Sequence, residues 1–109
     1  MLFRSFGFML RVRPEAKLTS RDLARHLDAN GVGNRMLFGG NLIRQPVFVR
    51  IKKEWPSSFR AQNELPGADQ IMKTTLFLGT YPALSNDMLK YKVNLMISFV
   101  NSTSKSLHA

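Results

Sequence analysis

The stretch that says most about the fold is residues 38–46, Phe-Gly-Gly-Asn-Leu-Ile-Arg-Gln-Pro. The apolar residues 36–38 predict a short buried strand that ends at the glycines. Gly39 and Gly40 end it because residues without a Cβ adopt positive φ and let other backbone approach closely. The stretch therefore predicts a strand that opens into a glycine-rich polar loop.

Three side chains that follow the paired glycines can form hydrogen bonds: Asn41, Arg44 and Gln45. The guanidinium of Arg44 presents a planar fork of donors that matches a carboxylate or a phosphate. Ligands bind at loops that follow strand ends in many α/β proteins. The loop is therefore a candidate binding site. The competing interpretation is a glycine turn that carries ordinary surface polar residues.

Length and composition indicate one small domain. The chain has 109 residues, of which 44% are hydrophobic, and this is enough to build a core. We expect a single domain over residues 1–109, with its core in about residues 6–101 and a disordered tail at 102–109. The sequence has no cysteine, which excludes disulfides, iron–sulfur ligation and cysteine nucleophiles from this chain. His26 and His108 have no second ligand type at metal spacing, so we expect no metal site.

The charge favours anionic partners, because the net charge is +9 and the pI is about 10.7. Twelve of the basic residues are spread through the first 60 positions without forming a run, which favours a solvated basic surface. No apolar run approaches the roughly 18 residues that a membrane span needs. The apolar residues near the N-terminus are too few for a signal-peptide core. We therefore expect a cytoplasmic protein with no membrane partner.

The segment before the loop predicts one strand and one helix. Apolar and mixed residues alternate over residues 6–12, which is typical of a strand, and Pro14 ends it. The helix is expected over residues 19–30, with Thr19 as the N-cap and Asp22 in the capping-box position. His26 on this helix is expected at the surface.

The segment after the loop is less regular. Apolar and polar residues alternate briefly over 47–51, and residues 52–66 predict a long exposed connection that contains Trp55. A short helix is expected at 68–73 and a strand at 76–80. A final helix begins after Ser85, and its apolar residues recur at helical spacing, which is typical of a core-facing stripe.

The order of these elements predicts the fold class. Strand, helix, strand, long excursion, strand and helix together indicate an α+β domain. We expect a small sheet of about three strands with two helices packed on one face. The other face also carries apolar residues such as Met9, so it is expected to have a partner.

Several motifs together resemble one known family. They are Phe6-Gly7-Phe8, residues 34–46 (NRMLFGGNLIRQP), and Asp69-Gln70-Ile71-Met72 ahead of Phe77-Leu78-Gly79-Thr80-Tyr81-Pro82. Over about residues 6–99 the chain resembles the C-terminal domain of the CDP-4-keto-6-deoxyglucose-3-dehydratase family. That family makes 3,6-dideoxyhexoses for lipopolysaccharide and is related to sugar aminotransferases of the aspartate-aminotransferase fold. The resemblance implies the small C-terminal domain of a fold-type I pyridoxal-phosphate enzyme. The chain departs from the family pattern at Asn34, Ile43, Phe77 and Ala83.

The resemblance also implies what this chain lacks. The family holds pyridoxamine phosphate in a large N-terminal domain, with a histidine as the base, and binds an iron–sulfur cluster through cysteines. None of these parts is expected here, so we assign no catalytic, cofactor-binding or metal-binding residue to this chain. The resemblance thus implies a fragment or truncated product that is inactive alone. The parent reaction would remove the C3 hydroxyl of a CDP-linked 4-keto sugar.

In that setting the loop would close one wall of the sugar-nucleotide site. Arg44 would bind the diphosphate, Asn41 and Gln45 would be orienting donors, and Arg35 would be a supporting charge. Alternatively, Arg44 would form a salt bridge to the absent large domain. The chain's partners would be a CDP-sugar in the full-length context and a large domain or homodimer partner.

The sequence alone is also compatible with two other classes of function. A basic α+β module could bind RNA on its sheet, which calls for exposed aromatic residues on the strands. Phe6 and Phe8 are interpreted as core residues, which makes nucleic acid the less favoured partner. A plain interaction domain that caps another subunit is the remaining alternative.

Overall fold

The computed structural model describes residues 7–105, and its centre is a three-stranded sheet. The strands are β1 (Gly7–Arg11), β2 (Asn34–Met36) and β3 (Thr75–Gly79). The late strand β3 lies in the middle and pairs antiparallel with both β1 and β2. This confirms the small sheet of three strands.

The register of the strands sorts their side chains between two faces. Leu10 of β1 and Met36 of β2 both pair with Leu76, so these three share one face. Met9 and Arg35 both pair with Phe77, which places Met9, Phe77 and Arg35 in one row on the opposite face. We call this second face the open face.

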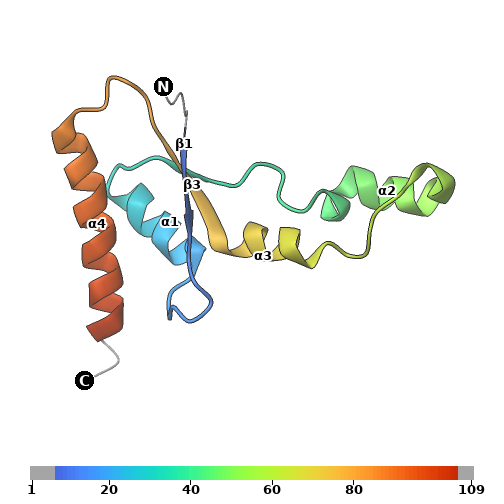
Figure 1. Ribbon diagram of the computed structural model, residues 1–109, viewed down its shortest axis with the longest axis horizontal. Coiled ribbons are helices and arrows are strands. Elements are labelled where there is room, and N and C mark those ends of the chain that lie inside the picture. Colours follow the sequence, from blue (N-terminus) through green and yellow to red (C-terminus); the bar gives the residue numbers. More distant parts are fainter. Residues whose placement is uncertain (1–6, 106–109) are drawn as a thin grey trace.

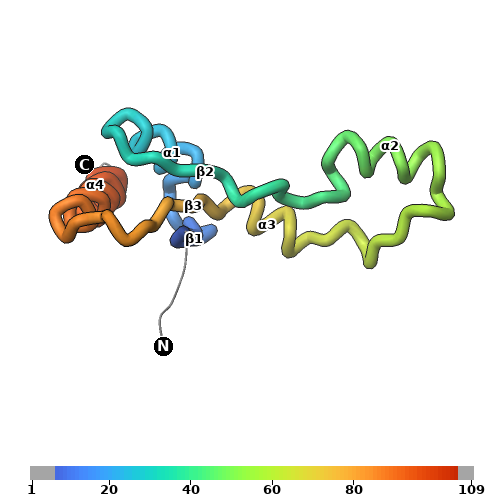
Figure 2. The backbone as a smooth tube through the Cα atoms, turned by 90° about the horizontal axis from the view of Figure 1, so that it is seen from above, coloured from blue at the N-terminus to red at the C-terminus, as the bar shows by residue number. Residues whose placement is uncertain are grey.

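Helices α1 (Ser20–Ala29) and α4 (Asn86–Lys105) cover the first face. Figures 1 and 2 show both helices on the same side of the sheet. The buried core between them and the sheet consists of Leu18, Leu23, Leu27, Val32, Leu76 and Leu78. Leu27 and Leu76 are fully buried, which marks the centre of this core. Two helices on one face of an α+β sheet were expected, and the structure confirms them.

The N-terminus of α1 forms as the sequence predicts. The backbone N–H of Asp22 donates to Thr19 Oγ1 at 3.1 Å, and the backbone N–H of Thr19 donates to Asp22 Oδ2 at 2.9 Å. This reciprocal capping box satisfies donors that a helix N-terminus leaves unpaired. The hydrogen bonds from Thr19 lower the pKa of Asp22, because they favour its charged form.

We call the sheet together with α1 and α4 the body. Two residues of the body lie in positions that differ from expectation. His26 is half-buried and not a plain surface residue, because its ring stacks on Phe99 of α4 with centroids 4.3 Å apart. Phe8 is 59% exposed and not in the core. It lies on the edge strand β1, whereas the residues that pack on the core in this region are Leu10 and Val12. Phe6 lies outside the described residues.

Between β2 and β3 the chain leaves this body and forms an arm, which we define as residues 42–65. The arm contains the short 3₁₀-helices η1 (Leu42–Arg44) and η2 (Pro56–Ser58) and, between them, helix α2 (Pro46–Glu54). Helix α3 (Pro66–Thr74) then returns the chain to the sheet. Figure 2 shows the arm extending away from α4, beyond α3. The Cα radius of gyration is 17.8 Å, against about 13 Å for a compact chain of this length.

Helix α2 was not predicted from the sequence, and it corrects the expectation of a long connection over residues 52–66. The apolar–polar alternation at 47–51 belongs to a helix, and the long connection 52–66 begins with the last residues of that helix. Pro46 occupies the first helical turn, where its missing N–H costs nothing, and Arg50 pairs with Glu54 one turn on. A helix satisfies its own backbone hydrogen bonds, whereas a strand at this position would need a neighbouring strand.

The other boundaries shift by small amounts. The strand expected at 36–38 lies at 34–36, so Leu37 and Phe38 are outside the sheet. Helix α4 continues to Lys105, so the disordered tail expected from residue 102 is wrong for residues 102–105. There the hydroxyls of Ser102 and Thr103 donate to the carbonyl of Phe99. The rest of the expected tail, 106–109, lies outside the described residues. Within residues 7–105, no helix combines the length and apolar character that crossing a membrane requires.

Candidate functional site

The base of the arm is tied together by the side chain of Asn41, which is 1% exposed. Its Nδ2 donates to the carbonyls of Glu64 and Leu65, at 3.3 and 3.2 Å, and to Asp69 Oδ1 at 3.0 Å. Its Oδ1 accepts from the backbone N–H of Ile43 at 3.3 Å. One buried amide thus joins the start of the arm to its end and to α3.

Arg44 forms the second tie, a bidentate ion pair with Asp69. Arg44 Nε donates to Asp69 Oδ1 at 2.6 Å, and Arg44 Nη2 donates to Asp69 Oδ2 at 2.5 Å. The pair lowers the pKa of Asp69 to about 2, first through the hydrogen bonds from Arg44 and further through that from Asn41. The same contact raises the pKa of Arg44. We call Asn41, Arg44 and Asp69 the latch.

The glycines beside the latch allow the loop to pack closely. Gly40 has φ +65°, and a Cβ on it would lie 2.5 Å from the sulfur of Met72 on α3. Gln45 Nε2 donates to the carbonyl of Gly39 at 2.6 Å, which closes the loop on itself. Glycines that let the loop pack closely were predicted here, and the close approach of Gly40 to Met72 gives the structural reason, although the strand itself ends earlier, at Met36.

Three of the four predicted site residues therefore meet at this loop, and one does not. Asn41, Arg44 and Gln45 lie together and use side-chain donors to hold the loop. The carboxylate that pairs with Arg44 belongs to Asp69 of this chain. The alternative interpretation from the sequence was a salt bridge from Arg44 to an absent large domain. Arg35 belongs to the open face of the sheet. Asp69 was recognised as part of a motif. Its partner Arg44 lies 25 positions earlier in the chain, so no local pattern in the sequence indicates their contact.

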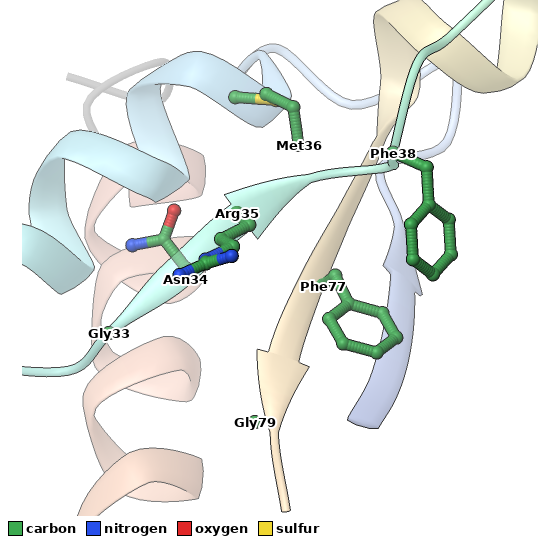
Figure 3. A pocket seen from close by; sticks show the side chains of 7 residues that line it. All are labelled: Gly33, Asn34, Arg35, Met36, Phe38, Phe77 and Gly79. Atoms are coloured by element: carbon green, nitrogen blue, oxygen red, sulfur yellow. The ribbon is translucent and has the colours of Figure 1, made fainter. Parts of the chain in front are cut away.

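A pocket of about 580 Å³ lies beside β2 on the open face. Figure 3 shows the residues that line it: Gly33, Asn34, Arg35, Met36, Phe38, Phe77 and Gly79. The rings of Phe38 and Phe77 are tilted against each other with centroids 5.8 Å apart. Sequence reasoning placed Phe38 in a buried strand, but its side chain is 76% exposed and its φ is +40°.

The chemistry of the two sites is that of anion and ring recognition. Among residues 7–105, the pocket lining contributes one guanidinium, two aromatic rings and no carboxylate. The latch presents a half-exposed arginine held by Asp69. Over residues 7–105, no group of three or more His, Cys, Asp or Glu side chains is placed to bind a metal ion. In the part of the chain that the structure describes, neither site contains a lysine or histidine that could act as a general base.

Comparison with known proteins gives the context of this geometry. A curated relative from Salmonella typhimurium, lipopolysaccharide biosynthesis protein RfbH, is 36% identical over 94 residues, which are 86% of this chain and 20% of RfbH. The dTDP-4-dehydro-2,6-dideoxy-D-glucose 3-dehydratase of Saccharopolyspora spinosa is 30% identical over 99 residues, which are 91% of this chain and 20% of that enzyme. The chain thus spans about a fifth of the length of these relatives.

A solved structure shares the fold. It is the E. coli GDP-4-keto-6-deoxy-D-mannose-3-dehydratase with bound hydrated PLP, with a TM-score of 0.69 and 19% sequence identity. The match covers 83% of this chain and 22% of that enzyme. The family profile described as the DegT/DnrJ/EryC1/StrS aminotransferase family matches residues 3–96, which is most of the chain. The chain belongs to the DegT/DnrJ/EryC1/StrS aminotransferase family.

Proposed function

We propose that this chain is the C-terminal part of an enzyme that removes the C3 hydroxyl from a nucleotide-linked 4-keto sugar in lipopolysaccharide biosynthesis. The observation that carries the proposal is the match of 30% over 91% of this chain to a sugar 3-dehydratase. The match to the lipopolysaccharide biosynthesis protein RfbH supports the pathway. The CDP-linked sugar is the substrate that the motifs of residues 34–46 favour, and the cytoplasm is the matching location.

The cofactor chemistry of such an enzyme would belong to the rest of a longer protein. Pyridoxal phosphate enzymes bind the cofactor through a lysine and pair its pyridinium nitrogen with an acid. The family that the chain resembles has a histidine as the base. Among the described residues, the lining of the pocket on the open face has no lysine, histidine or acid, and the carboxylate of the latch is occupied by Arg44. Neither of these two sites fits pyridoxal or pyridoxamine phosphate. We assign the cofactor and any iron–sulfur cluster to a large domain, and we expect this chain to be inactive alone.

The part that this chain would play is to present the loop to the sugar nucleotide. Asp69 engages two of the five N–H donors of Arg44, and the side chain is 48% exposed, so the fork is fixed while other donors can face a phosphate oxygen. Asn41 and Gln45 orient this loop through their contacts with its backbone. Arg35 adds positive charge from the neighbouring sheet face. A guanidinium that is already oriented loses little freedom when it binds a diphosphate.

The test uses the enzyme in which this chain is joined to a large domain. We expect Arg44→Ala to lower kcat/KM for the nucleotide sugar roughly ten- to a hundred-fold, because a charge-assisted hydrogen bond contributes about 1.5–3 kcal/mol. Arg44→Lys should recover only part of this loss, because lysine lacks the fork. Arg50→Ala is the matched control, since Arg50 is also an exposed arginine paired with a carboxylate, Glu54, on the arm.

Two results separate a ligand role from a structural one. Steady-state kinetics of Arg44→Ala with a raised KM and an unchanged melting temperature would support the contact with the nucleotide sugar. An unchanged kcat/KM with a lower melting temperature would make Arg44 a strut between the arm and α3, and the ligand role would be wrong.

A further inference from the structure

Phe38 has an unusual backbone for a bulky residue. Its φ of +40° lies in the left-handed region, where the Cβ of an L-residue clashes with neighbouring backbone. Burial does not compensate for this strain, because the side chain is 76% exposed. Two glycines that could take such a conformation more easily follow directly. Strained residues of this kind cluster where the side chain must be held in place for a ligand.

The strain places the ring of Phe38 at the pocket on the open face. Phe77 forms a second aromatic wall there, at a ring-centroid distance of 5.8 Å (Figure 3). Phe77 is itself held in place, because its ring packs over Gly7 so closely that a Cβ on Gly7 would lie 1.7 Å from it. The volume of about 580 Å³ is in the range of small-molecule sites.

Arg35 supplies the charge of the same pocket. It pairs with Phe77 in the antiparallel register, so both side chains leave the sheet on the open face. Of the lining residues that the structure describes, none is acidic and could neutralise Arg35. A surface that combines two aromatic rings with one unopposed guanidinium favours a planar ring that carries a negative charge nearby.

We propose that this pocket binds the base of a nucleotide, with the first phosphate on Arg35. Because the rings of Phe38 and Phe77 lie at 51° to each other, the base would stack on the face of one ring and contact the other with its edge. The proposal rests on the proposed function, because it assigns a subsite to the nucleotide sugar of that enzyme. It adds a base subsite on the sheet that is separate from the latch at Arg44. Stacking uses the face of a base and not its edges, so the pocket would accept pyrimidines and purines alike.

The test is an NMR titration of the purified chain with CMP, GMP and ribose 5-phosphate. We expect CMP and GMP to shift the ring protons of Phe38 and Phe77 and the amides of Gly33 and Gly79. Ribose 5-phosphate, which lacks a base, should bind about 5- to 100-fold more weakly, which is the range that stacking of one base supplies. Arg35→Gln should weaken all three ligands.

Variants at Phe38 separate binding from folding. Phe38→Leu should lower the affinity for CMP by a similar factor, because it removes the aromatic ring. The melting temperature should stay close to that of the unchanged chain, because leucine has the same strain at positive φ. Phe38→Gly should also lose binding, yet should melt no lower than the unchanged chain, because glycine adopts positive φ without strain. Trp55→Leu is the control, because Trp55 is an exposed aromatic residue on the arm, and it should bind CMP normally.

Several outcomes would overturn the proposal. Equal affinity for CMP and ribose 5-phosphate would make the pocket a simple phosphate site. The absence of shifts at about 10 mM nucleotide, with the chain folded, would mean that it binds no base. Much tighter, steeply salt-dependent binding of a short RNA would instead make the open face an RNA surface. Turnover by the joined enzyme that is insensitive to Phe38→Leu would reject this subsite and leave the proposed function intact.

Discussion

The body and the arm of this protein are held by different forces. In the body, α1 and α4 bury a core whose central residues, Leu27 and Leu76, are fully inaccessible to water. In the arm, neither α2 nor the two 3₁₀-helices bury a single residue. The arm is instead fixed at its base by the amide of Asn41 and the ion pair of Arg44 with Asp69.

In this protein, the interactions that stabilise the fold differ from those that fix the direction of the arm. Hydrophobic burial stabilises the body without fixing a direction, because it is proportional to area and has no preferred geometry. Hydrogen bonds need alignment, so a few of them fix the direction of an arm that buries little. The exposed apolar residues of the arm, among them Val47, Val49 and Trp55, form a surface that this chain itself does not cover.

The largest difference between body and arm is expected in how much stability each loses when apolar atoms are removed. We expect Leu27→Ala to lower the free energy of unfolding by about 2–5 kcal/mol, because it leaves a cavity in the core. Val49→Ala on α2, which is 52% exposed, should change it by no more than about 0.5 kcal/mol. Urea unfolding followed by circular dichroism measures both, and similar losses would mean that the arm also packs against the body.

Asn41 tests whether the latch alone positions the arm. Asn41→Ala removes the side-chain donor to the carbonyls of Glu64 and Leu65 and to Asp69, although the Leu65 carbonyl keeps the backbone N–H of Asp69. Each lost hydrogen bond contributes about 0.5–1.5 kcal/mol, and up to about 3 kcal/mol where the partner is charged. We expect faster amide exchange and proteolysis across residues 42–65, with the protection of α1 and β3 unchanged. Gln62→Ala, an exposed polar residue of the arm, is the matched control. A loss of protection spread equally over the body would show that arm and body unfold as one unit.

The smallest loss of stability is expected at low pH, where protonation of Asp69 weakens its ion pair with Arg44. The pKa of Asp69 is about 2 in the folded chain and about 3.9 for an unfolded aspartate. Its carboxylate therefore stabilises the latch fully above about pH 4, and this contribution is lost as the pH falls towards 2. Carboxyl ¹³C NMR should place the midpoint of Asp69 near 2, and Arg44→Gln should move it up towards 4. Arg50→Gln should not move it, and a midpoint near 4 in the unchanged chain would contradict the pairing.

The sequence predicted the elements whose causes are local. The capping box of Thr19 and Asp22 lies within three residues, so it could be recognised. The apolar stripe of α4, expected to face the core, was wrong in part, because Val93 and Val100 are 48% and 45% exposed and the residues that pack against the core are Leu95, Met96 and Phe99. Helix α2 was not predicted, because the brief apolar–polar alternation at 47–51 does not follow helical spacing. The end of strand β2 was placed two residues late because apolar character does not reveal that Phe38 turns to positive φ.

The candidate site was predicted in part, for the same reason. The loop residues Asn41, Arg44 and Gln45 could be selected as polar side chains after paired glycines. Their partners could not be, because Asp69 is 25 and 28 positions away from Arg44 and Asn41. The pocket on the open face depends on the register that sets Arg35 opposite Phe77, and register is a property of the folded sheet.

The order of the sheet, with its last strand in the centre, also bears on how the chain is made. Residues of β1 pair with partners in β3 that follow them by more than 60 positions, so β1 has no neighbour when it leaves the ribosome. At ~5–20 residues per second, roughly 3–12 s pass before β3 is synthesised. During that interval β1 and β2 present unpaired backbone and the apolar side chains that α4 later covers. Release of the nascent chain before Gly79 would leave two edge strands with no centre, which is the state that chaperones bind and proteases remove.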